Sequence, residues 1–307
     1  MADINKVDKR NKKGAVIMIV VWSAIAVLLA ALVVMLAVTG GFEGLFGEPR
    51  VVATAEMDGD AFDSVEISWK AGKVEVTRSA DGLMHLTQRS RYNVEELEYG
   101  VENGRLVLRD RSGWGLIFFG IGSRSSDLEL QLPDKEYEEF LLSMSSGSSS
   151  LDGVAAGTMQ LKLTSGRLTG SGLSAGSLEA RMTSGNMKVA GAASDSLRVE
   201  ITSGKAEFSG SFSSVEGEAT SGTVRIDTDV VPEALNGKLT SGRMVFTIPD
   251  CDGFSLYCRK SSGSLKSDFD LLQSVSDKNQ YVYGAGGPAY NTQLTSGTLE
   301  LRRAGQT

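Results

Sequence analysis

A Ser-Gly dipeptide, usually preceded by Thr, recurs at a nearly constant interval through the second half of this chain. Its glycines are Gly147, Gly166, Gly185, Gly204, Gly222, Gly242, Gly263 and Gly297, and the first seven are 18 to 21 residues apart. A fixed period of about 20 residues is typical of solenoids, in which each repeat forms one coil. The repeat therefore predicts a long stacked surface and disfavours most enzyme folds.

Apolar residues alternate with polar ones on both sides of each repeated glycine. Around Gly166, for example, the apolar positions are Met159, Leu161, Leu163 and Leu168. This alternation predicts two short strands in each coil, each with one buried side, and a turn at the glycine. Stacking at about 4.8 Å would continue each apolar row through the protein. The predicted fold class is all-β: a β-solenoid of about 19–21-residue coils.

An earlier coil precedes the main series. Gly72 has apolar residues at the same offsets, namely Val65, Ile67, Trp69, Val74 and Val76. The solenoid is therefore expected to cover residues 50–303, followed by a short tail at 304–307. Residues 78–139 interrupt the repeat and are expected to form extra strands or a cap that protects one end of the stack.

The N-terminal segment predicts a membrane anchor in front of the solenoid. Residues 15–38 are 24 positions without a charge, long enough for a transmembrane α-helix. Residues 1–14 form a basic tail and residues 39–49 a Gly-rich tether. The positive-inside rule then predicts a single-pass protein of the cell membrane, with a cytoplasmic N-terminus and an extracytoplasmic C-terminal domain. A cleaved signal peptide is the alternative, but this apolar run is longer than such peptides usually carry.

The remaining polar residues give little sign of catalysis. The chain carries a formal net charge of −7, which disfavours nucleic acid as a partner. Its one histidine, His85, lies outside the repeats, and its carboxylates are scattered as on a solvated face. We therefore predict no catalytic residues, no metal site and no cofactor.

One coil carries three unusual residues. Cys251 and Cys258 could form a disulfide in an exported protein, or Cys258 could pack as a small apolar group on an inward position. Lys260 stands where other coils carry Leu or Ile, so either the register slips there or its side chain reaches solvent. The sequence leaves both questions open.

The repeat resembles a known family. The run from Leu161 to Leu168, with Thr164, Ser165 and Gly166 at its centre, is similar to the Thr-Ser-Gly repeats of a bacterial family labelled "putative adhesin". The resemblance covers about residues 50–303. It implies an extracytoplasmic β-repeat domain of unknown biochemical function, often behind a single membrane helix and sometimes encoded near envelope-stress regulators. It supplies no catalytic residues.

Two segments are candidates for binding. The residue after each repeated glycine is expected to point outward, and in this row Arg167, Lys205 and Arg243 would lie about 9–10 Å apart. Such a row could hold an anionic cell-wall polymer, although neighbouring carboxylates could neutralise it. The second candidate is a hydrophobic segment that caps the core or contacts a membrane or partner; it contains Trp114, Leu116, Ile117, Phe118 and Phe119.

Together these features favour a membrane-anchored binding, scaffold or adhesin-like protein of the bacterial cell envelope, possible partners being a wall polymer or an envelope protein. The alternative is an enzyme that acts on cell-wall glycans from a β-solenoid. A pair of carboxyl groups about 5–10 Å apart in a groove, which a glycosidase requires, would favour the enzyme over the binding protein.

Overall fold

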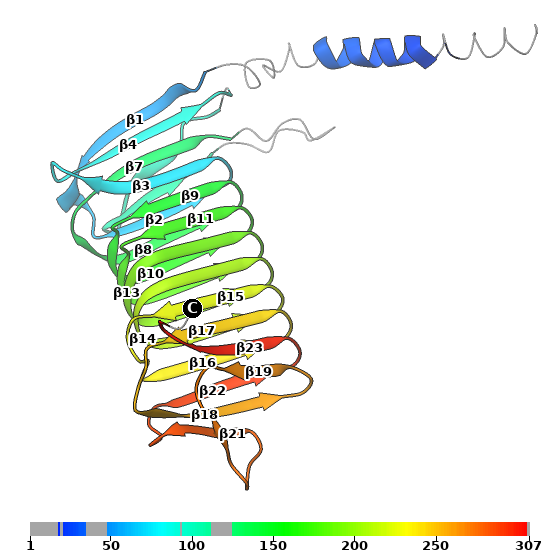
Figure 1. Ribbon diagram of the computed structural model, residues 1–307. Coiled ribbons are helices and arrows are strands. Elements are labelled where there is room, and N and C mark those ends of the chain that lie inside the picture. Colours follow the sequence, from blue (N-terminus) through cyan, green and yellow to red (C-terminus); the bar gives the residue numbers. More distant parts are fainter. Residues whose placement is uncertain (1–17, 19–20, 35–47, 93, 112–124, 306–307) are drawn as a thin grey trace, which may run out of the picture.

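Each sequence repeat forms one coil of two short strands joined by the Ser-Gly turn (Figure 1). In this computed structural model, residues 18, 21–34, 48–92, 94–111 and 125–305 are described. The strands that precede the turns lie side by side in one wall, which we call face A. The strands that follow the turns form the opposite wall, face B.

The strand order on each face follows from the pairing. Face A runs in the spatial order β5 (Glu98–Glu102), β6 (Arg105–Arg109), β2 (Ser64–Trp69), β8 (Glu136–Met144), β10 (Ala155–Leu163), β12 (Ser174–Met182), the second half of β13 (Asn186–Ile201), the second half of β14 (Lys205–Ala219), β16 (Ala234–Leu239), β22 (Ala289–Leu294), β18 (Gly253–Lys260), β21 (Gln280–Gly284) and β20 (Leu272–Gln273). Strands β13 and β14 pass from one face to the other without a break.

Face B contains the other half of each coil. Its spatial order is β1 (Arg50–Asp58), β4 (Leu83–Ser90), β7 (Asp127–Pro133), β3 (Lys73–Ser79), β9 (Ser148–Asp152), β11 (Arg167–Ser171), the first halves of β13 and β14, β15 (Thr223–Thr228), β17 (Arg243–Ile248), β23 (Thr298–Arg303) and β19 (Ser264–Ser267). A short 3-10 helix, η1 (Gly59–Ala61), follows β1.

The core is a set of apolar rows between the two faces. Leu161 on face A aligns with Ala180 and Val199 of the next two coils, and all three are buried. On face B, Leu168 aligns with Met187, both again buried. Coils stacked in register thus bury one another's apolar positions, which a single coil could not do alone. The alternation read from the sequence accounts for this arrangement.

Glycine is needed at the turns because the coils touch there through their backbones. Gly166 has a φ of +115°, a conformation that other residues rarely adopt. A Cβ added to it would lie 2.1 Å from the carbonyl oxygen of Gly147 in the coil before. The same close approach recurs at Gly185, Gly204 and Gly242, so one atom of side chain would push successive turns apart.

At both ends of the stack, the spatial order of the coils differs from their order in the sequence. The coil formed by β2 and β3 lies between β6/β7 and β8/β9, although β6 and β7 come later in the chain than β2 and β3. At the other end, β22 and β23 lie between β16/β17 and the coil of β18 and β19 (Figure 1). The last repeat of the sequence is therefore not the last coil in space.

An aromatic cluster and a hairpin lie at the outer end of the stack, around the coil of β18 and β19. The ring of Phe254 packs against those of Phe269, Tyr283 and Tyr290 at centroid distances of 5.1 to 5.4 Å. Strands β20 and β21 pair antiparallel beside β18 and cover the edge of face A. Covering an edge strand in this way prevents pairing with another chain.

The structure answers the questions raised by the unusual coil. Cys251 and Cys258 are free, and Cys258 is fully buried on an inward position. Burial raises the pKa of both thiols. Lys260 is exposed at the end of β18, with its Nζ 5.8 Å from the ring centroid of Tyr281. An apolar residue is not required there because the coil is outermost.

The predicted membrane anchor is wrong on this structure. Residues 21–34 are helical and largely exposed. No helix among the described residues is both long and apolar enough to cross a membrane. The fold class is therefore corrected to a β-solenoid without the transmembrane helix placed at 15–38, and the single-pass localisation with a cytoplasmic N-terminus loses its support.

Candidate functional site

The row that follows the turn glycines on face B carries a cation in every second coil. Ser148, Arg167, Asn186, Lys205, Thr223 and Arg243 align strand by strand along it. Lys73 extends the row by pairing with Ser148, a position that the sequence series did not include. At about 4.8 Å between strands, alternate members lie about 9–10 Å apart.

The coils that lie between those of Arg167, Lys205 and Arg243 also carry a cation, but two residues further along the strand than this first row. Lys188 on β13 and Arg225 on β15 occupy this second row. From Arg167 to Arg243, each of five successive coils thus contributes one basic side chain, alternating between the two rows. Sequence reasoning missed Lys188 and Arg225 because it followed one offset from the glycine, whereas the zigzag uses two. We call Arg167, Lys188, Lys205, Arg225 and Arg243 the cationic zigzag.

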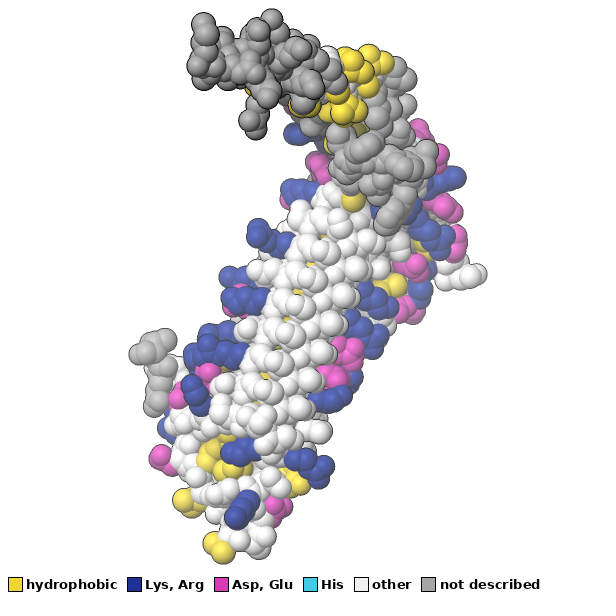
Figure 2. Space-filling model, turned by 90° about the vertical axis from the view of Figure 1, so that its right-hand side faces the viewer, with side chains coloured by type: hydrophobic (Ala, Val, Ile, Leu, Met, Phe, Trp, Pro, Cys, Tyr) yellow, Lys and Arg dark blue, Asp and Glu magenta, His cyan; other side chains and the backbone are white. Residues whose placement is uncertain are grey.

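The two flanks of the turn surface differ in their charged side chains (Figure 2). An uncharged strip formed by the Thr, Ser and Gly residues of the turns runs along the molecule, and Lys and Arg side chains gather along one flank (Figure 2). Along the other flank, basic and acidic side chains are mixed (Figure 2).

Carboxylates neutralise part of the cationic zigzag. Lys205 pairs with Glu207 at 2.7 Å, and Arg225 pairs with Asp227 at 2.8 Å. Arg243 lies 2.6 Å from Glu300, whose side chain is only 8% exposed. The hydrogen bond that Arg243 donates to Glu300 raises the pKa of Arg243, so its charge is committed to that partner.

Two members keep their charge available. Arg167 and Lys188 are both exposed, and neither forms an ion pair with any residue that the structure describes. They lie on adjacent coils, so their side chains project from neighbouring strands β11 and β13. The end of the zigzag nearest β11 is therefore the part best suited to hold a negatively charged group.

Face A carries a network of alternating charges instead. Arg198 pairs with Glu216 at 2.5 Å and approaches Glu218 at 3.9 Å, while Lys238 pairs with Glu218 at 2.5 Å. Burial alone would raise the pKa of Glu200, but hydrogen bonds from Arg198 and from Arg181 hold it below the ordinary value. The ionised form of Glu200 is thus stabilised.

The other predicted residues do not assemble into a site. His85 lies on β4, with its Nε2 2.8 Å from Asp81 and its Nδ1 3.4 Å from Glu56. The hydrophobic segment with Trp114, Leu116, Ile117, Phe118 and Phe119 lies outside the described residues.

The comparisons identify the family. The family model described as Toastrack DUF4097 matches residues 62–300, and the chain belongs to this family. The resemblance to bacterial adhesin-like repeat proteins, read from the Thr-Ser-Gly run, is thereby confirmed. No relative was found among curated proteins.

Solved structures are similar to this chain. A putative adhesin from Bacteroides fragilis is 11% identical and has a TM-score of 0.52, with 82% of this chain and 97% of that chain covered. A putative lipid binding protein from Parabacteroides distasonis is 14% identical with a TM-score of 0.42, covering 84% of this chain and 98% of that chain. At these identities the likeness concerns the fold alone.

Proposed function

We propose that this chain is a binding protein whose cationic zigzag holds an extended anionic polymer, such as a wall or lipid-linked teichoic acid. The observation that carries the proposal is the arrangement of one basic side chain per coil over five coils from Arg167 to Arg243. A linear repeat of charge on the protein matches a linear repeat of phosphate on a polymer. A compact ligand would use only one or two of these groups.

The spacing makes the charges act together. Consecutive residues of the cationic zigzag lie on neighbouring strands and are offset by two residues along the strand. Their Cα atoms are therefore about 8 Å apart. This is close to the Debye length of about 8 Å at physiological ionic strength, so the potentials of neighbouring groups overlap. The chain as a whole carries a net charge of −7, so attraction of a polyanion depends on this local row and should weaken as salt is added.

Binding without catalysis fits the carboxylates of the fold. A glycan-cleaving enzyme needs a carboxyl group that keeps its proton near neutral pH. Glu216 and Glu218 share one groove on face A, and Glu200 and Glu218 share another. All three carboxylates contact Arg198, and Glu218 also contacts Lys238. These carboxylates are thus held in ion pairs, an arrangement that fits a structural role on this face better than catalysis.

The test uses the two members without acidic partners. We expect poly(glycerol phosphate) to bind the full-length protein with an affinity that falls steeply with salt. The double change Arg167→Ser and Lys188→Ser should weaken this binding at least about tenfold, a loss of roughly 1.4 kcal/mol. Lys205 and Arg243 are unsuitable first choices, because changing either one also breaks an ion pair, with Glu207 or with Glu300.

The matched control removes the same charge elsewhere. Lys162 on face A and Lys278 beyond β20 form no ion pair with a described residue, so Lys162→Ser with Lys278→Ser gives the same net charge off the zigzag. This control should bind like the parent protein. Equal loss in both double variants, or no binding by the parent, would contradict the proposal.

A further inference from the structure

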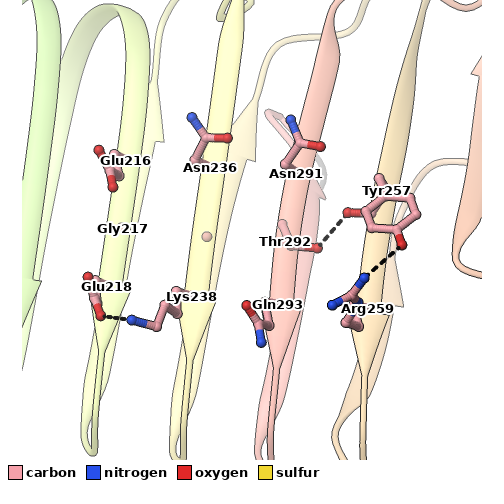
Figure 3. Close-up of a pocket in the computed structure, with 11 residues that line it drawn as sticks. Glu216, Gly217, Glu218, Asn236, Lys238, Tyr257, Arg259, Asn291, Thr292 and Gln293 are labelled. Carbon is pink, nitrogen blue, oxygen red and sulfur yellow. Dashed lines mark hydrogen bonds and ion pairs between the residues drawn. The ribbon is translucent and has the colours of Figure 1, made fainter.

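A groove of about 340 Å³ crosses face A near its C-terminal end, on the wall opposite the cationic zigzag (Figure 3). Four neighbouring strands form its floor: β14, β16, β22 and β18. Across these strands runs one row of outward side chains, made by Glu216, Asn236, Asn291 and Tyr257. Beside it runs a second row, made by Glu218, Lys238, Gln293 and Arg259.

Two glycines lie in the floor of the groove. Gly217 and Gly237 align on neighbouring strands at an inward position that carries larger residues in most other coils. A Cβ at Gly237 would lie only 3.1 Å from Sδ of Met244 and from Cε2 of Phe246, which project from face B. The side chains of Met244 and Phe246 thus occupy the interior space that side chains on these two strands would fill.

The centre of the groove presents hydrogen-bonding groups without protein partners. The side-chain amides of Asn236, Asn291 and Gln293 make no hydrogen bond to any described residue. Figure 3 shows the Asn236 and Asn291 amides side by side on adjacent strands and pointing the same way. Each amide offers two donors and one acceptor oxygen. Two of them about 4.8 Å apart can hold a series of hydroxyl groups, each of which donates and accepts.

An aromatic ring and balanced charges complete the groove. The half-buried ring of Tyr257 stands at one end, and its hydroxyl lies 3.5 Å from Nη2 of Arg259. At the other end Glu218 pairs with Lys238. The lining contains two carboxylates and two cations, so it has no net charge to select an ion.

These observations point to one ligand class. We infer that the groove binds a neutral oligosaccharide whose sugar rings follow the solenoid axis, about one ring for each strand crossed. The amides of Asn236 and Asn291 bind ring hydroxyls, and the face of Tyr257 packs on the apolar C–H surface of the terminal ring. This site is separate from the cationic zigzag and does not depend on it.

The unusual strand order creates this site. Asn291 comes from β22, which is inserted between β16 and β18, and it aligns with Asn236 on one side and Tyr257 on the other. If the coils followed sequence order, Tyr257 would lie directly beside Asn236, and the paired amides would be lost. The sequence alone therefore gave no sign of the site.

Isothermal titration and ligand-observed NMR with cellotetraose and chitotetraose test the inference on the full-length protein. At least one of the two should give saturable binding. Asn291→Ala and Tyr257→Ala should each weaken it about tenfold or more, whereas Tyr257→Phe should keep most of it, because the ring face is retained. The matched control is Gln160→Ala, which removes an amide from the same row in a coil outside the groove.

The outcomes are separable from those of the polymer test. The double change Arg167→Ser and Lys188→Ser should leave saccharide binding unaltered, since those residues lie on face B. The inference fails if neither saccharide binds, if Asn291→Ala binds as well as the parent while its thermal melt is unchanged, or if Gln160→Ala weakens binding equally.

Discussion

Arg243 and Glu300 form an ion pair with an N–O distance of 2.6 Å although 57 residues separate them in the chain. The contact exists because β23 is inserted directly beside β17. Arg302 binds the same carboxylate at 2.7 Å, so Glu300 is held by two guanidinium groups. The pair fastens the last repeat of the sequence to the coil of β16 and β17.

This pair predicts acid sensitivity at the C-terminal end. The hydrogen bond from Arg243 lowers the pKa of Glu300 from its ordinary 4.5. A lowered folded-state pKa gives stability that is present above the ordinary value and is lost as pH falls through the lowered one. Thermal melts from pH 7 to pH 3 should therefore show a steeper loss in the parent than in Glu300→Gln, which should be less stable at pH 7. Identical pH profiles would contradict this.

His85 predicts a dependence of opposite sign at the N-terminal end. The hydrogen bond with Asp81 raises the pKa of His85 above its ordinary 6.5. Its stabilising effect is fully present below pH 6.5 and disappears as pH rises through the raised value. Protection of β1 and β4 against hydrogen exchange should fall between pH 6 and pH 8, and His85→Gln should flatten that change. A slope that persists in the variant would assign the effect to other groups.

The turn glycines predict a large difference between two similar substitutions. At Gly185, with a φ of +114°, an added Cβ would lie 2.2 Å from the oxygen of Gly166. Gly191 also has a positive φ, +62°, but nothing lies within 4 Å of an added Cβ. Gly191→Ala should cost about 1–2 kcal/mol from backbone strain alone, and Gly185→Ala more than about 3 kcal/mol or the fold itself. Denaturant titration measures both; equal costs would mean that the coils adjust freely.

The aromatic cluster predicts that the outer coil depends on one ring. Phe254 is fully buried and contacts three other aromatic rings. Phe254→Ala should lower the free energy of unfolding by about 3–5 kcal/mol. Leu272→Ala, at a side chain that is 73% exposed on the neighbouring hairpin, should change it by less than about 0.5 kcal/mol. A small effect of the first change would mean that the cluster does not hold the coil.

The periodic part of the fold could be predicted from the sequence because each coil repeats the same local pattern. The inward positions of Met159, Leu163 and Leu168 follow from alternation alone, and all three are buried. The N-terminal apolar run was misread because lack of charge over 24 residues does not establish the length of a helix. Lack of charge is a property of composition, whereas crossing a membrane requires a continuous helix of sufficient length.

The candidate sites were predictable only in part. Arg167, Lys205 and Arg243 share one offset and were found by counting, whereas Lys188 and Arg225 lie on a second offset. The saccharide groove was not predictable because it needs the pairing of Asn291 with both Asn236 and Tyr257. The position of each coil in the stack depends on how well the ends of the stack are covered. No local sequence pattern records this order.

The reversed coil order at both ends divides the molecule into parts with different freedom to change length. Between β8 and β17 the coils follow the sequence, so one more 19-residue unit inserted there would add about 4.8 Å and disturb only two neighbouring contacts. At either end of the stack, one coil already lies between two coils that are its neighbours only in space. An added unit there would have to separate these contacts. Growth and shortening of such a protein are therefore expected within its middle, while the two ends, with the contacts that close them, keep a constant size.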